Sequence, residues 1–332
     1  MTRRMSRILA ATVALGFTWS AGAAIGAPAA MLKQFKVPTA NSDPFAVTNG
    51  SDGNRWFTEG NDLTGSPAKI ARITPAGAIT EFPAGVAAGC NVCILHDIAQ
   101  GPGSILYITS NGSNLMRFNE TTQSFQSAVD VAPTGAFNNL AVGGGNVWIT
   151  DFNTNVVWRY TIATGVITNF PAHTPIDVAV DASGNAWFTE NFNNADGTSN
   201  IGRIGVNASS TDPVTYTKIP APAGSITVAP NGKVWFGEAF GPAVGLFDPA
   251  GAAIVTMFPV PAPPAGIAVA PDGTIWFTQN SKGNIASITE ADVITEDKVV
   301  KGSGPLGITV APNGNPWYTM QGANKIATLQ LG

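Results

Sequence analysis

The chain has 332 residues, of which 44% are hydrophobic and 11% are charged, and its formal net charge is −4. This balance excludes a disordered chain, which combines low hydrophobicity with high net charge. A sequence pI near 5.1, with no run of Lys or Arg, argues against a nucleic-acid partner. The 37 glycines and 24 prolines are typical of many short strands joined by tight turns.

Residues 1–24 are predicted to be a secretory signal peptide. Three arginines precede an apolar stretch over residues 8–19, and a segment of small residues follows. Cleavage is expected after Ala23 or Ala24, with Ala30 as the alternative. The apolar stretch is too short for a comfortable membrane span, and no second one follows. We therefore expect a secreted or periplasmic protein without a membrane span, and nothing in the sequence demands an oligomer.

Residues 31–332 are predicted to form one domain of seven repeated units. Each unit should contain an apolar first strand, a Pro-Asp-Gly or Pro-Asn-Gly turn, a strand built on Trp-Phe-Thr-Glu, a third strand, and a fourth strand ending in aromatic-Pro. The matched aromatic residues are Trp56, Tyr107, Trp148, Trp187, Trp235, Trp276 and Trp317. Their spacing of 39–51 residues is typical of propeller blades. The predicted fold is therefore all-β, a seven-bladed β-propeller of four-stranded antiparallel blades, with the tryptophans packed between blades.

The ends of the chain are predicted to close the ring. The last unit stops at Gly332 before a fourth strand, whereas Leu32–Pro38 has the aromatic-x-x-Pro ending of a fourth strand. We expect this N-terminal strand to complete the seventh blade, because closure removes an open sheet edge.

The units resemble the streptogramin B lyase (virginiamycin B lyase) family over nearly the whole mature chain. The resemblance rests on Trp-Phe-Thr-Glu, on Asn-Ile-Gly-Arg-Ile at 200–204 and on Ile-Thr-Glu-Phe-Pro at 79–83. It implies a propeller that opens a cyclic depsipeptide ester by elimination, with Mg²⁺ as electrophile and a histidine as base in the last two blades.

This chain departs from the family pattern at the catalytic positions. Where the resemblance leads one to expect histidine, the chain has Ala265 and Leu306. Where it implies glutamate, the chain has Gly304 and Gln321. Since leucine and glutamine cannot take a proton and bind Mg²⁺ poorly, the same chemistry is not expected at the same place.

A different polar site is predicted where the first strands begin and the Trp strands end. These positions are expected to lie at one mouth of the central channel, and they hold His96, Glu59, Asp151, Glu190, Glu238, Gln279 and Asn138. Oxygen ligands suit Mg²⁺ or Ca²⁺, and His96 is then a candidate base. The simpler interpretation is that the carboxylates cap turns or accept hydrogen bonds from backbone amides.

Cys90 and Cys93 are the only cysteines, spaced Cys-x-x-Cys in a loop. In an exported protein this spacing predicts a short-loop disulfide. A zinc site with His96 is the alternative, but it lacks a fourth ligand.

Three functions follow from these patterns. The first is a propeller that binds a small molecule or partner at the channel mouth, which the missing lyase residues favour. The second is a metal-assisted carbon–oxygen lyase or lactonase that uses the acidic residues and His96. The third is a module that contacts a cell-envelope polymer or another protein. Insertions near residues 61–67 and 193–199 add loops to one face, where recognition usually resides.

Overall fold

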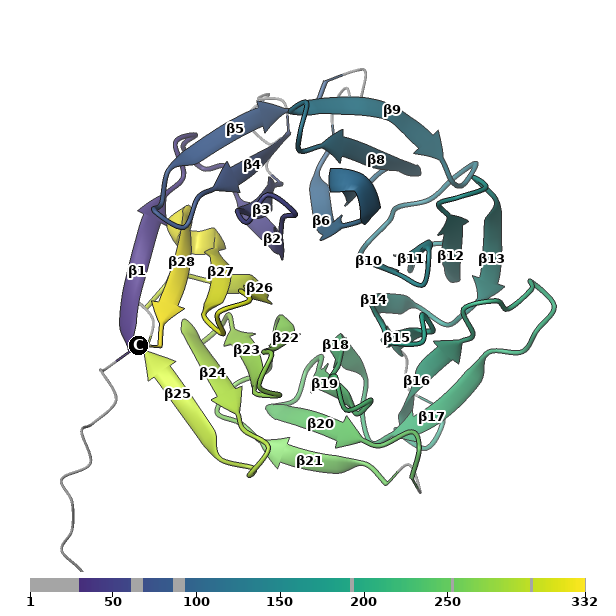
Figure 1. The fold of residues 1–332 in the computed structure, drawn as a ribbon. Helices are drawn as coiled ribbons and strands as arrows, with labels where there is room; N and C mark the ends of the chain where they lie inside the picture. The colour runs from purple at the N-terminus through teal and green to yellow at the C-terminus, as the bar shows by residue number, and fades with distance from the viewer. Residues whose placement is uncertain are drawn as a thin grey trace, which may run out of the picture.

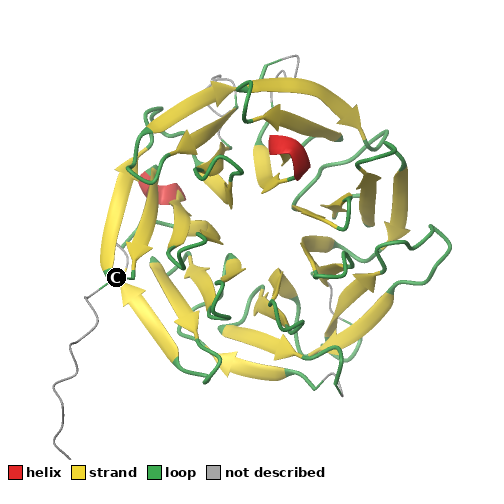
Figure 2. Ribbon diagram, viewed as in Figure 1, coloured by secondary structure: helices red, strands yellow, loops and turns green. Residues whose placement is uncertain are grey.

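The computed structural model describes residues 30–60, 68–85, 93–191, 194–251, 254–298 and 301–331. Within these ranges the chain forms seven four-stranded antiparallel sheets arranged as blades around a central axis (Figure 1). Strands make up nearly all of the regular structure, and the helices are two short 3₁₀ turns (Figure 2). The predicted seven-bladed β-propeller is confirmed. The predicted signal peptide, residues 1–24, lies outside the described residues.

In blades 1 to 6 the strands run from inner to outer in chain order, whereas the outer strand of blade 7 is β1. The strands are, for blade 1, β2 (Pro44–Asn49), β3 (Arg55–Glu59), β4 (Lys69–Ile73) and β5 (Ile79–Pro83); for blade 2, β6 (Leu95–Gln100), β7 (Ile105–Ser110), β8 (Asn114–Asn119) and β9 (Ser124–Asp130); for blade 3, β10 (Leu140–Gly143), β11 (Asn146–Asp151), β12 (Val156–Thr161) and β13 (Ile167–Pro171); for blade 4, β14 (Pro175–Val180), β15 (Ala186–Glu190), β16 (Ser199–Ile204) and β17 (Thr215–Ile219); for blade 5, β18 (Ala223–Val228), β19 (Val234–Glu238), β20 (Ala243–Phe247) and β21 (Thr256–Pro259); for blade 6, β22 (Ile267–Val269), β23 (Ile275–Gln279), β24 (Asn284–Ile288) and β25 (Ile294–Lys298); and for blade 7, β26 (Pro305–Val310), β27 (Pro316–Met320), β28 (Lys325–Gln330) and β1 (Met31–Lys36). The 3₁₀ turns are η2 (Pro102–Ser104) and η3 (Gln321–Ala323).

The N-terminal strand closes the ring as predicted. β1 pairs antiparallel with β28, with Leu32 opposite Leu329 and Phe35 opposite Ile326, and it forms the outer edge of blade 7 (Figure 1). The two ends of the chain therefore complete one four-stranded sheet, in which β1 rather than β28 is the outer edge strand.

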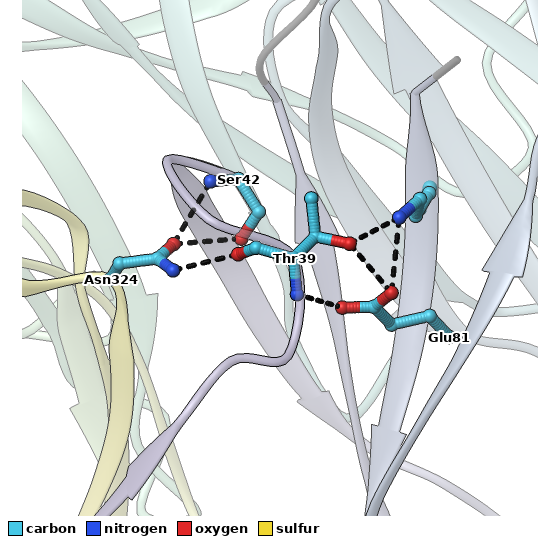
Figure 3. Close-up of polar contacts among 5 residues, drawn as sticks. Thr39, Ser42, Glu81 and Asn324 are labelled. Carbon is cyan, nitrogen blue, oxygen red and sulfur yellow. Dashed lines mark hydrogen bonds and ion pairs between the residues drawn. The ribbon is translucent and has the colours of Figure 1, made fainter. Parts of the chain in front are cut away.

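A polar latch fixes the segment that leads from β1 into blade 1 (Figure 3). On the blade 7 side, the Asn324 side chain accepts hydrogen bonds from the Ser42 amide and hydroxyl, both at 2.9 Å, and donates to the Thr39 carbonyl at 2.7 Å. On the blade 1 side, the Thr39 amide and hydroxyl donate to the Glu81 carboxylate at 2.8 and 2.7 Å. Lys69 pairs with Glu81 at 3.0 Å. The latch thus links the last blade to the first.

The hydrophobic core lies between blades. Trp56, for example, is fully buried in a cluster that combines Ile70 of blade 1 with Leu95 and Phe118 of blade 2. Arg72, opposite Trp56 on the neighbouring strand, places its guanidinium 5.8 Å from the indole centroid. The same arrangement recurs in blades 3 and 4. The matched tryptophans are therefore core residues, as expected from their repetition.

Buried threonines join neighbouring blades close to the axis. Thr150, the fifth residue of β11, accepts a hydrogen bond from the Asn139 amide at 3.1 Å and donates to the Ile176 carbonyl of the next blade at 2.7 Å. Equivalent bonds to a neighbouring blade's carbonyl are made by Thr58, Thr109, Thr278 and Thr319. Each bond ties a backbone carbonyl near the start of one blade's inner strand to the Trp strand of the preceding blade.

The described part of the chain contains no helix with the length and hydrophobicity that crossing a membrane requires.

Candidate functional site

A cavity of about 420 Å³ lies on the ring axis, where the innermost strands begin. Its wall is built from the first strand of each blade, or from the residues just before it. Only these strands face the axis (Figure 1). The lining residues are Phe45, Ala46, Val47, His96, Asp97, Asn138, Asn139, Leu140, Ile176, Asp177, Val178, Ile226, Ala265, Gly266, Ile267, Leu306, Gly307 and Ile308.

A repeated β-bulge explains why consecutive residues line the wall. The register of β6 against β7 shifts between Leu95 and Ile98, so that His96 and Asp97 together face one residue of the partner strand. β2, β14 and β26 contain the same shift at their starts. A bulge bends the strand and re-aims side chains, which is why both residues of each pair reach the cavity.

The wall is polar on one side. Blades 2, 3 and 4 contribute His96, Asp97, Asn138, Asn139 and Asp177. These five residues are called the polar arc below. Because blades 2, 3 and 4 are consecutive in the ring, the polar arc lies on one side of the cavity.

Asp97 and Asp177 are held rigidly by the neighbouring blades. Asp97 accepts hydrogen bonds from the Ile98 amide at 2.8 Å and, across the blade boundary, from the Leu140 amide at 2.9 Å. Asp177 accepts from Val178 at 2.8 Å, from the Asn139 side chain at 2.7 Å and from the Ile226 amide of blade 5 at 2.9 Å. The two carboxyl groups therefore serve both as part of the cavity wall and as links between blades.

Burial makes both carboxyl groups weaker acids than usual. Burial raises the pKa of Asp97 to about 7, and the negative charge of Asp177 adds to this effect. Burial likewise raises the pKa of Asp177, to about 6, although three hydrogen bonds favour its ionised form. Near neutral pH Asp177 is therefore mostly ionised, while Asp97 is divided between its ionised and protonated forms.

His96 lies in the same wall, and its hydrogen bond to the backbone shows which ring nitrogen carries the hydrogen. Its Nδ1 lies 2.7 Å from the Phe137 carbonyl oxygen, and its ring packs against Phe45 with centroids 5.9 Å apart. A carbonyl can only accept, so Nδ1 must donate its hydrogen there. In the neutral imidazole, Nε2 is then the proton acceptor.

The opposite side of the cavity is apolar and contains small residues. Blades 6, 7 and 1 contribute Ala265, Leu306, Phe45 and two glycines. A Cβ added at Gly307 would lie 2.5 Å from the Phe45 carbonyl, and one at Gly266 would lie 2.5 Å from the Leu306 carbonyl. The backbones of adjacent blades approach so closely here that only glycine fits.

Of the residues predicted from the sequence, only His96 and Asn138 line the cavity. Glu59, Asp151, Glu190 and Gln279 are buried at the ends of their Trp strands, and Glu238 is partly exposed. The expected convergence of the acids on the channel is not observed. The reason is geometric, since side chains of a second strand project from the faces of its blade toward neighbouring blades and loops.

Most of these side chains have local partners. Asp151 accepts a 2.6 Å hydrogen bond from the Thr154 hydroxyl in the turn that follows. Glu190 accepts from the His173 amide at 2.9 Å and from the Asn200 side chain at 3.2 Å. Gln279 donates to the Ala262 carbonyl at 2.7 Å. Among the described residues, no three His, Cys, Asp or Glu side chains are grouped so that they could hold a metal ion.

Asp97, Asn139 and Asp177 were not predicted as site residues. Each directly follows a residue that was expected to face the channel, and strict strand alternation would turn it away from the axis. A bulge overrides this alternation for Asp97 and Asp177, whereas Asn139 lies just before β10. The cysteine loop is only partly described. Cys93 is disulfide-bonded, and Cys90 lies outside the described residues.

Comparison with known proteins places the chain among lyase-like propellers. The model of the virginiamycin B lyase family matches residues 3–224 and 196–332. A streptogramin B lyase structure is 24% identical, covers 91% of this chain and 98% of its own, and superposes with a TM-score of 0.77. Virginiamycin B lyase from Staphylococcus aureus is also 24% identical, with 91% and 99% coverage and a TM-score of 0.76.

More distant propellers share only the fold. A Kuenenia stuttgartiensis hydrazine synthase chain is 12% identical, with 89% and 97% coverage and a TM-score of 0.73. No curated protein sequence matches the chain significantly.

Proposed function

The chain belongs to the virginiamycin B lyase family, and from this premise we propose that its propeller binds a small ligand in the central cavity without performing the family's elimination reaction. One observation supports this proposal above all: the cavity wall is divided into the polar arc and an apolar side. Ligand sites commonly combine apolar walls with a few fixed polar groups in this way.

The residues at the family's catalytic positions support binding over catalysis. The resemblance leads one to expect histidines at positions 265 and 306, and here Ala265 and Leu306 line the cavity. The cavity thus remains, while its wall at those positions is apolar. A ligand is then positioned by fixed polar groups and hydrophobic contact, with no proton acceptor at those positions.

The test is a thermal-shift screen of small molecules against the purified protein and two matched variants. Leu306→Trp fills the cavity, whereas Val293→Trp adds the same side chain at a position that is 55% exposed. Ligands should stabilise the wild type and Val293→Trp and lose their effect in Leu306→Trp. Equal stabilisation of Leu306→Trp would place the ligand elsewhere and refute the proposal.

A metal-assisted lyase or lactonase is the second proposal, and His96 is the observation that favours it. Its hydrogen bond to Phe137 leaves Nε2 as proton acceptor, as a general base requires. Turnover of a depsipeptide or lactone in Mg²⁺ or Ca²⁺ that disappears in His96→Ala would support it. A cation-dependent thermal shift of the wild type that is lost in Glu190→Gln would support the predicted metal, and absence of any such shift in the wild type would remove the metal from this scheme.

We also propose that the protein is exported and meets its ligand in the cell envelope or outside the cell, as a monomer. The N-terminal sequence pattern supports export. N-terminal sequencing of the protein from a periplasmic fraction or medium should find a start at Ala24 or Ile25. An intact N-terminus in the cytoplasm would contradict this location.

A further inference from the structure

We propose that the ligand of the central cavity is an amphipathic organic cation, whose protonated amine binds between Asp97 and Asp177 and whose apolar body packs toward Leu306. This inference rests on the proposed binding function of the cavity and adds the chemical class of the ligand.

The charges of the cavity wall select for a cation. Among the lining residues, the charged side chains are Asp97 and Asp177, His96 is the only other titratable group, and neither Lys nor Arg is present. An anion would meet two carboxylates without a compensating positive charge. Because the wall is partly shielded from water, this preference is stronger than it would be on an open surface.

Both carboxylates retain acceptor positions after their structural bonds are counted. A carboxylate offers about four acceptor positions. Asp97 uses two for the Ile98 and Leu140 amides, and Asp177 uses three for Val178, Asn139 and Ile226. An ammonium group has three N–H donors that can occupy the remainder. Since neighbouring blades already hold both carboxylates, binding costs little side-chain ordering.

The wall facing the aspartates suits the rest of such a ligand. Leu306, Ile308, Ile267 and Phe45 present apolar surface there, and Gly266 and Gly307 add no side chain to the space. A fully polar cation, such as a free inorganic ion, would leave this surface without a partner. An amine with an aromatic or aliphatic body uses both sides of the cavity.

Binding should depend on pH in a defined direction. The titratable groups that face the cavity from the described strands are Asp97, Asp177 and His96. Burial raises the pKa of Asp97 to about 7 and of Asp177 to about 6, so an ammonium must displace protons from them in mildly acidic solution. Affinity for a cation should therefore rise between pH 5 and pH 8, and binding at pH 6 should release protons.

The test compares three probes with the same ring system: tryptamine, tryptophol and indole-3-acetate. Calorimetric titration of the wild-type protein at pH 7.5 should show tryptamine binding at least about tenfold more tightly than tryptophol, with indole-3-acetate weakest, because a charge-assisted hydrogen bond adds roughly one factor of ten. At pH 6, titrations in buffers of different ionisation enthalpy should reveal proton release only with tryptamine. Equal affinities, a preference for the carboxylate, or no binding of tryptamine at millimolar concentration would overturn the inference.

Variants separate the contribution of the aspartates to probe binding from that of the apolar side of the cavity. Asp177→Asn should reduce the preference for tryptamine over tryptophol to less than about threefold, and Leu306→Ala should weaken both probes alike. Asp130→Asn, an exposed aspartate outside the cavity, is the charge-matched control and should behave as the wild type. If Asp177→Asn fails to fold, the relative affinities of the three probes and the proton release at pH 6, both measured on the wild type, still test the inference. The screen could instead find a neutral ligand that stabilises the wild type but not Leu306→Trp, with no preference for amines. That result would support the proposed binding function and overturn only the inference that the ligand is a cation.

Discussion

Glu59 at the end of β3 is a buried carboxyl group whose titration should be measurable in the stability of the whole ring. Its side chain is 2% exposed, and neither carboxylate oxygen has a hydrogen bond of normal geometry among the described residues. Burial raises the pKa of Glu59 to about 8, and the charge of Glu81 adds to the effect. Lys69 and the Ser42 hydroxyl lower the pKa only in part. Glu59 is therefore protonated in the folded protein at neutral pH.

The sign of the pH dependence follows from proton binding. Between the ordinary pKa of 4.5 and the folded value of about 8, the folded state holds a proton that the unfolded chain has lost. The free energy of unfolding must then fall as pH rises, by about 1.4 kcal/mol per pH unit from this group. From pH 5 to pH 7 the loss is roughly 3 kcal/mol. The contribution of Glu59 is complete below pH 4.5 and is lost by pH 8.

Replacing Glu59 by glutamine should remove this slope. Glutamine imitates the neutral acid, so Glu59→Gln should be about 3 kcal/mol more stable than the wild type at pH 7 and less than about 1 kcal/mol more stable at pH 5. Urea unfolding at pH 5, 6, 7 and 8 measures both. Glu290→Gln, which removes an exposed carboxylate, controls for net charge. Asp97 and Asp177 titrate in the same range, so only the difference from wild type is informative. Parallel curves for the wild type and Glu59→Gln would refute the reasoning.

Three further substitutions test how the blades are joined. Thr150→Val removes the hydroxyl that bridges blades 3 and 4 and should lower the free energy of unfolding by about 2–4 kcal/mol, whereas Thr150→Ser should stay near wild type in the same denaturation assay. Gly307→Ala should lower the melting temperature because its Cβ would meet the Phe45 carbonyl, while Gly85→Ala, with open space around it, should not. Asn324→Ala should lower it more than Asn324→Gly, since both lose the latch bonds but alanine is also strained at a φ of 53°; equal losses would contradict this account.

The repeat pattern made the fold predictable from sequence, including the closure by β1. Each unit pairs an apolar strand with a Gly-containing turn and a Trp strand, and these are local signals that recur seven times. The N-terminal strand was recognisable because its aromatic-x-x-Pro ending completes the unit that the C-terminus leaves unfinished. The burial of the tryptophans followed from the same repetition.

The candidate site was only half predictable. Position in the repeat identified His96 and Asn138 as axial residues, because the first strand of a blade always faces the ring centre. The same reasoning counted Glu59 and Glu190 as axial, although the faces of a blade point toward its neighbours. Strand alternation also hid Asp97 and Asp177, since a bulge that turns two consecutive residues toward the axis leaves no signal in a single sequence.

The sequence alone therefore determined the number of blades, their strand order and the way the ring closes, because local hydrophobic periodicity and turn chemistry specify these features. Only the tertiary structure decided which polar side chains meet. Asp97 and Asp177 are 80 residues apart in the chain, and their common environment arises from two bulges and from the amides of Leu140 and Ile226 on the adjoining blades. Contacts of this kind depend on how whole blades pack around the axis, which no local pattern records.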